Sequence, residues 1–84
     1  MTAAPTRPEL YLQVGAFADR RHAEDLRRQL ERADFRQVCV QPSYSRPTAL
    51  FRVRIGPLPS VSDCDRLAQR IAAYGIHGAY AVVE

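Results

Sequence analysis

The chain contains an internal repeat: moved along by 41 residues, its first half matches its second. The matched positions carry apolar residues or glycine, in the pairs Leu12 with Val53, Val14 with Ile55, Gly15 with Gly56, Phe17 with Leu58, Leu26 with Leu67 and Leu30 with Ile71. The 84 residues are enough for one domain. Two copies of one supersecondary unit therefore predict a pseudo-symmetric fold with a single shared core.

Each copy has the pattern of a strand, a helix and a second strand. Alternating apolar and polar side chains, the period of a half-buried strand, cover residues 10–15, 37–41, 50–55 and 79–83. Apolar residues recur at helical spacing after Asp19 and after Ser62, which are both good N-caps. Gly75 predicts the end of the second helix.

Two such units predict an α+β fold of the ferredoxin-like type, β-α-β-β-α-β, with a four-stranded antiparallel sheet. Each strand has only one apolar side, so both helices cover the same face and the other face stays open to solvent. Cys64 then lies beneath the sheet and Cys39 on the open face. A disulfide between them is therefore not expected.

Composition excludes some classes of protein. Residues 1–9 hold two prolines and few apolar residues, which indicates a linker or an expression remnant and leaves residues 10–84 as the domain. We find no apolar run long enough for a membrane span and no signal peptide, so we expect no membrane contact by this domain. All twelve basic residues are arginine against nine acids, a net charge of +3 that permits a nucleic-acid partner without requiring one.

The titratable residues do not predict catalysis. Seven of the nine acidic residues fall on helices or their ends, where they act as caps and solvated faces: Asp19, Glu24, Asp25, Glu31, Asp34, Asp63 and Asp65. His22 and His77 have no second ligand or carboxylate at a useful spacing. Cys39 and Cys64 have neither metal spacing nor a nearby histidine. We therefore expect no catalytic residues, no metal and no cofactor.

The open sheet face carries unusual residue types. An ordinary solvated face favours threonine, lysine and glutamate, whereas this one presents Tyr11, Gln13, Leu50, Arg52, Arg54, Tyr80 and Val82. Aromatic rings stack on apolar ligand faces, and amide and guanidinium groups bind polar ones. The stretch from Gln41 to Thr48, with Tyr44, predicts a lip beside this face. A purely solubilising role for Arg52 and Arg54 is the alternative.

Two segments carry a family resemblance. LYLQVGAF, from Leu10, and FRVRIGPL, from Phe51, resemble the two motifs of SPOR domains, and the likeness extends over residues 10–84. It implies a module of the bacterial cell envelope that binds septal peptidoglycan in the periplasm. We expect this module to be non-enzymatic and monomeric. The ligand implied is denuded glycan, strands of N-acetylglucosamine and N-acetylmuramic acid without stem peptides. It also implies a parent protein with its own catalytic domain, such as an amidase or a lytic transglycosylase of the rare lipoprotein A type.

Carried over residue by residue, the resemblance implies glycan contacts along the open face. Gln13 matches the motif amide, and Arg52 matches the third-strand arginine. Ala16 stands where serine is frequent, and Leu50 where a large aromatic is frequent, so tyrosines compensate for a lost hydroxyl and a smaller stacking surface. The complete set of expected glycan contacts is Tyr11, Gln13, Gly15, Ala16, Tyr44, Leu50, Arg52, Arg54 and Tyr80.

Two other kinds of binding remain open. RNA-recognition motifs share this strand order and bind through the open face, but they need aromatic side chains on both central strands. Here the third strand offers Leu50, Arg52 and Arg54, with Phe51 turned inward, so RNA is disfavoured and no nucleic acid is expected. A protein-interaction module of the divisome is the remaining alternative.

Overall fold

The structure is a computed structural model that describes residues 8–43 and 49–84. Its elements in chain order are β1 (Leu10–Phe17), α1 (Arg20–Arg32), β2 (Val38–Ser43), β3 (Leu50–Leu58), α2 (Val61–Tyr74) and β4 (Tyr80–Val83). The predicted element order is confirmed. The strand predicted over residues 37–41 continues further, to Ser43, because the pairing of β2 with β3 extends over Pro42 and Ser43, which were assigned to the lip. Tyr44 lies outside the described residues.

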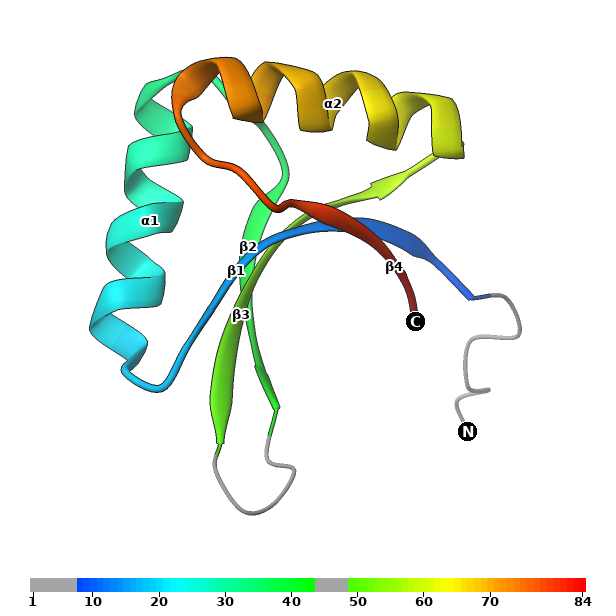
Figure 1. Cartoon of the computed structure of the whole chain (residues 1–84). Helices are drawn as coiled ribbons and strands as arrows, with labels where there is room; N and C mark the ends of the chain where they lie inside the picture. Colours follow the sequence, from blue (N-terminus) through cyan, green and yellow to red (C-terminus); the bar gives the residue numbers. More distant parts are fainter. Residues whose placement is uncertain (1–7, 44–48) are drawn as a thin grey trace.

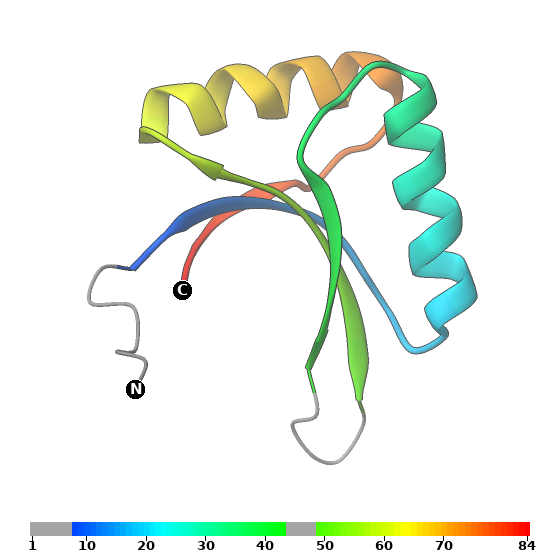
Figure 2. The same cartoon turned by 180° about the vertical axis from the view of Figure 1, so that it is seen from behind.

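All four strands form one antiparallel sheet in the order β2-β3-β1-β4. Figures 1 and 2 show α1 and α2 on the same side of this sheet, so the predicted two-layer arrangement is confirmed. The strands bend strongly, with the helices on the convex side and the open face concave (Figure 1). Neither described helix has the length and apolarity needed to cross a bilayer.

The core is built from the repeat. The residues of two matched pairs, Leu12 with Val53 and Leu30 with Ile71, are each at most 1% exposed to solvent. Because each copy of the unit contributes one strand residue and one helix residue, the two copies share a single apolar interior. Cys64 joins this core, as predicted, and burial raises the pKa of its thiol.

The helix ends follow local capping chemistry. Asp19 caps α1, as predicted, by accepting a 2.8 Å hydrogen bond from the backbone N–H of Arg21. For α2 the prediction of Ser62 as the N-cap was wrong. The cap is Ser60, whose Oγ accepts from the backbone N–H of Asp63 at 3.2 Å. The earlier start adds two residues to the predicted helix, and the N–H of Cys64 donates a hydrogen bond to the Ser60 carbonyl.

A β-bulge in β1 changes which residues face the open side. Gln13 pairs with Arg54 and Gly15 pairs with Val53, so Val14 is the extra residue. Gly15 consequently lies on the same side of the sheet as Val53, the side that faces the helices. A Cβ built on Gly15 would lie 3.1 Å from Cδ2 of Leu26 in α1. The prediction that Gly15 faces the open side was therefore wrong, because strict alternation fails across a bulge.

Candidate functional site

The strand register arranges the open face in four rows. One row crosses all four strands through Cys39, Arg54, Gln13 and Tyr80; the others are Gln41 with Arg52 and Ala16, Ser43 with Leu50, and Tyr11 with Val82. Every predicted site residue in the described part of the chain lies on this face except Gly15. Successive rows are about 7 Å apart, so the face extends for roughly 20 Å along the central strands.

Arg54 lies at the centre of a hydrogen-bonded network. It is 4% exposed, and Gln13 beside it is 6% exposed. Arg54 Nε donates to Gln13 Oε1 at 3.0 Å, and Nη1 donates to Gln41 Oε1 at 2.8 Å. Gln13 Nε2 in turn donates to the Tyr80 hydroxyl at 2.8 Å. The network thus ties all four strands together across the concave side of the sheet.

A carboxylate completes the network. Arg54 Nη1 also donates to Glu84 Oε1 at 2.5 Å, and the two side chains are 5% and 57% exposed. The hydrogen bond and charge of Arg54, together with the charge of Arg52, hold the pKa of Glu84 below its ordinary value. Gln41 and Glu84 were missed as site residues. The alternation along the last strand places Tyr80 and Val82 outward. Continued by two residues, the same alternation identifies Glu84.

These contacts divide the predicted site residues into two groups. Among the described residues, no buried side-chain nitrogen or oxygen lacks a hydrogen-bond partner. Gln13 and Arg54 therefore form the interior of the network, with most of their bonding capacity used within the protein. Their position explains a shaped, rigid face more directly than it explains ligand contact.

The second group consists of residues that still reach solvent. Arg52 is partly exposed and forms no hydrogen bond or ion pair with another described residue. Tyr80 is 57% exposed, and its hydroxyl accepts from Gln13 while keeping its own proton to donate. Leu50 precedes Arg52 by two residues on β3, and Ala16 on β1 pairs directly with Arg52. A cation without a described partner, with apolar neighbours and with an exposed tyrosine elsewhere on the same face, suits a ligand that has both polar groups and flat apolar surfaces.

Tyr11 extends this surface at the far row. Its hydroxyl lies 3.4 Å from Glu9 Oε2. Burial, followed by the charge of Glu9, raises the pKa of the Tyr11 hydroxyl. The phenol therefore stays protonated near neutral pH and keeps its capacity to donate.

The titratable groups of the described residues do not converge on a reactive centre. Across residues 8–43 and 49–84, no three His, Cys, Asp or Glu side chains gather as metal ligands. His22 is exposed and packs edge-on against Phe17. Both cysteines are free thiols. The open face thus offers hydrogen-bond donors and ring surfaces, which are suited to binding.

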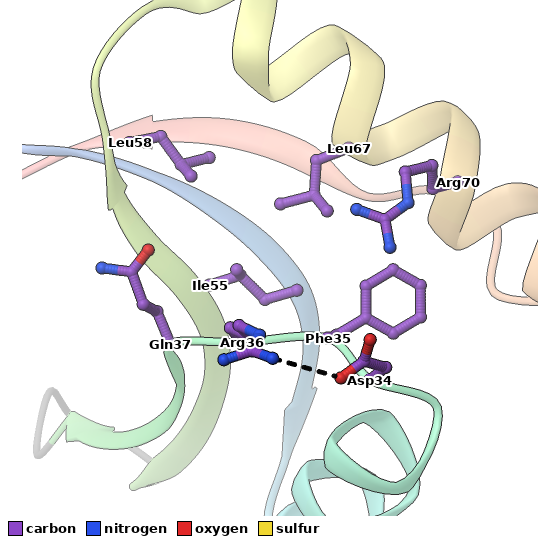
Figure 3. A pocket seen from close by; sticks show the side chains of 8 residues that line it. All are labelled: Asp34, Phe35, Arg36, Gln37, Ile55, Leu58, Leu67 and Arg70. Atoms are coloured by element: carbon purple, nitrogen blue, oxygen red, sulfur yellow. Dashed lines mark ion pairs between the residues drawn. The ribbon is translucent and has the colours of Figure 1, made fainter.

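A separate hollow lies on the helix side, between α2, the end of β3 and the segment that follows α1. It has a volume of about 340 Å³ and is shown in Figure 3 with its lining side chains Asp34, Phe35, Arg36, Gln37, Ile55, Leu58, Leu67 and Arg70. Arg70 stacks 4.9 Å from the Phe35 ring centroid, and Arg36 pairs with Asp34 at 3.7 Å. None of the predicted site residues lines this hollow.

The fold and the face together define a small, non-catalytic binding module. The family model described as the SPOR domain matches residues 7–82. The crystal structure of the RlpA SPOR domain from Pseudomonas aeruginosa matches with a TM-score of 0.77 and 33% identity, over 87% of this chain and 96% of that chain. None of the curated proteins compared matches the chain.

The chain belongs to the SPOR domain family. SPOR domains are non-catalytic modules that bind peptidoglycan and act in targeting to the division septum of the cell envelope. The resemblance seen in the two strand motifs is thereby confirmed.

Acid is expected to weaken the network through Glu84. Its folded pKa is lowered, so its contribution to stability is complete above the unfolded value of about 4.3 and is lost as the pH falls through the folded value. Thermal unfolding of the wild type and Glu84→Gln, followed from about pH 7 to about pH 2, measures this contribution. The wild type should be more stable near neutrality, and the two curves should converge in acid. A difference that stays constant with pH would contradict it.

Proposed function

We propose that this domain binds denuded glycan strands through the concave open face and thereby recruits a parent protein to the division septum in the periplasm. The observation that carries the proposal is Arg52, whose guanidinium is unpaired within the described residues and lies beside Leu50 and Ala16 on that face. The proposed contacts are the solvent-reaching residues Arg52, Leu50, Ala16, Tyr11 and Tyr80, and Tyr44 is expected to join them. Gln13 and Arg54 shape the face from beneath.

The chemistry of a denuded strand suits these residues. Each sugar ring has an apolar face on which a tyrosine ring or Leu50 can pack, and hydroxyl and acetamide groups at its edges. N-acetylmuramic acid also carries a lactyl carboxylate, which a guanidinium can bind with charge-assisted hydrogen bonds. Several rings lie along a face of this length, so many small contributions add up to the affinity.

The preference for denuded strands follows from the same contact. The stem peptide is attached through the lactyl carboxyl group, so its presence replaces an anion by a neutral amide. Arg52 then loses a charge-assisted partner, and the peptide adds bulk against a concave surface. Both effects disfavour intact peptidoglycan.

The wider context is also a proposal. We infer that residues 10–84 form the domain, that residues 1–9 act as a linker, and that the domain is monomeric. The similarity to the SPOR domain of RlpA supports a parent protein of the same kind, a lytic transglycosylase of the rare lipoprotein A type. Catalysis then belongs to another domain of that parent.

Co-sedimentation with purified peptidoglycan tests the proposal. Wild-type protein should bind amidase-treated material more tightly than material with intact stem peptides. Arg52→Ala should weaken binding to the treated material by about tenfold or more, because one charge-assisted hydrogen-bond pair is lost. The thermal stability should be almost unchanged, since Arg52 has no partner among the described residues.

Arg66→Ala is the matched control. Arg66 is 74% exposed on α2, on the opposite side of the sheet, so its loss removes the same charge away from the face. Equal retention of wild type on treated and intact peptidoglycan would overturn the denuded preference. Equal weakening by Arg52→Ala and Arg66→Ala would show that only net charge matters.

A further inference from the structure

The carboxylate that pairs with Arg54 belongs to Glu84, a residue that is itself open to solvent. Arg54 is held within the sheet with a side chain 5% exposed, whereas the side chain of Glu84 is 57% exposed. One partner of this ion pair is therefore part of the rigid face. The other can leave into water with little change in its hydration.

The remaining partners of Arg54 are neutral. Gln13 and Gln41 accept hydrogen bonds from Nε and Nη1, which orient the guanidinium plane but do not balance its charge. Within the described residues Nη2 has no hydrogen-bond partner, and no buried polar side-chain atom lacks one, so Nη2 reaches solvent. A donor of Arg54 thus faces outward next to the Glu84 carboxylate.

Arg52 lies one row further along the same strand. Its charge also acts on Glu84, although the two side chains form no ion pair within 4.0 Å. The Glu84 carboxylate is therefore paired with the Arg54 guanidinium and also lies within the electrostatic influence of Arg52. This arrangement is an anion-binding position that is already occupied by a side chain of the protein.

We propose that Glu84 is an internal substitute for the ligand, and that the lactyl carboxylate of a muramic acid residue takes its place on Arg54 when denuded glycan binds. This inference rests on the proposed function and extends it from Arg52 to a second, deeper guanidinium. The exchange replaces one charge-assisted hydrogen bond by another, so the buried cation keeps an anionic partner in both states. A sugar without a carboxylate cannot displace Glu84 in this way, which makes Glu84 a determinant of specificity as well as a competitor.

The substitution Glu84→Gln tests the exchange. Glutamine has nearly the same size and can still accept a hydrogen bond from Arg54, but it does not compete as an anion. Binding is measured by calorimetry with two oligosaccharides of equal length. One alternates N-acetylglucosamine with N-acetylmuramic acid and has no peptides, and the other contains N-acetylglucosamine only.

The variant should bind the muramic acid oligosaccharide about threefold to tenfold more tightly than the wild type. Its affinity for the N-acetylglucosamine oligosaccharide should be unchanged. Wild-type binding without a gain in the variant would overturn the exchange and leave the proposed function standing. An equal gain for both oligosaccharides would also overturn it, because the effect would then not involve the ligand carboxylate.

A second measurement does not depend on strand binding. The Nε resonance of Arg54 is followed by NMR in Glu84→Gln during titration with monomeric N-acetylmuramic acid or N-acetylglucosamine. We expect a saturable shift with the acid and none with the neutral sugar. If the wild type binds no glycan, the proposed function is wrong. If, in addition, the Arg54 resonance does not shift with the acid, the proposed anion site at Arg54 is wrong as well.

Discussion

Replacement of Arg54 by methionine is expected to lower the free energy of unfolding by about 2–4 kcal/mol. Methionine fills most of the volume of the arginine stem but removes all the donors. Gln13 Oε1 then lies buried without its partner, and Gln41 Oε1 loses its bond as well. A buried acceptor left unsatisfied costs about 1–3 kcal/mol, with less for Gln41 because it is only partly buried. Urea denaturation monitored by circular dichroism gives the value.

Arg52→Met is the matched control for this experiment. Arg52 lies on the same strand and the same face, two residues away, but has no hydrogen-bond partner among the described residues. Its replacement should change stability by no more than about 0.5 kcal/mol. The two variants should therefore separate stability from binding, since Arg54→Met loses both and Arg52→Met loses mainly binding. Equal destabilisation by the two would refute the network as the source of the difference.

Gly56→Ala should cost about 2–4 kcal/mol, for two reasons that act together. The backbone φ of Gly56 is +147°, a conformation that an L side chain rarely adopts. A Cβ there would also lie 3.0 Å from both the Leu10 carbonyl oxygen and Tyr11 Cδ2. The contact at Leu10 is with a backbone oxygen of the neighbouring strand, so a rotamer change of Leu10 cannot relieve the clash. Urea denaturation measures the loss, and weaker glycan binding should accompany it through displacement of Tyr11.

Gly78→Ala distinguishes strain from clash. Gly78 also has a positive φ, +85°, but nothing lies within 4 Å of a Cβ built on it. Its replacement should cost only about 1–2 kcal/mol, the ordinary penalty for this backbone region. Equal losses at Gly56 and Gly78 would show that the close approach of Leu10 and Tyr11 contributes nothing.

Much of the fold could be predicted because its determinants are local or repeated. Alternation in residues 10–15 and 50–55, with the helical spacing that follows each, is a property of short segments. The repeat then required two equal units in one core, and Leu12, Val53, Leu30 and Ile71 are indeed the four largest of its fully buried side chains. The choice of the open face as the site followed from the same pattern, since only one side of each strand is apolar.

The exceptions within this pattern arise from strand pairing. A bulge exists only relative to a partner strand, so the extra residue Val14 has no local signature in β1. It turns Gly15 inward under α1 and leaves Ala16 beside Arg52 on the open face. The cap of α2 was ambiguous for a different reason, because Ser60 and Ser62 are each followed by an aspartate three residues later.

By itself, then, the sequence determined the β-α-β-β-α-β architecture, the membership of the core and the face that carries Gln13, Arg52 and Arg54. Only the tertiary structure decided that these three side chains differ in role. Exposure depends on what neighbouring strands contribute. Here Gln41 from β2 and Glu84 just beyond β4 bond to Arg54, and Tyr80 from β4 bonds to Gln13. None of those contacts is encoded in the period of a single strand, since they join residues far apart in the chain on a bent sheet.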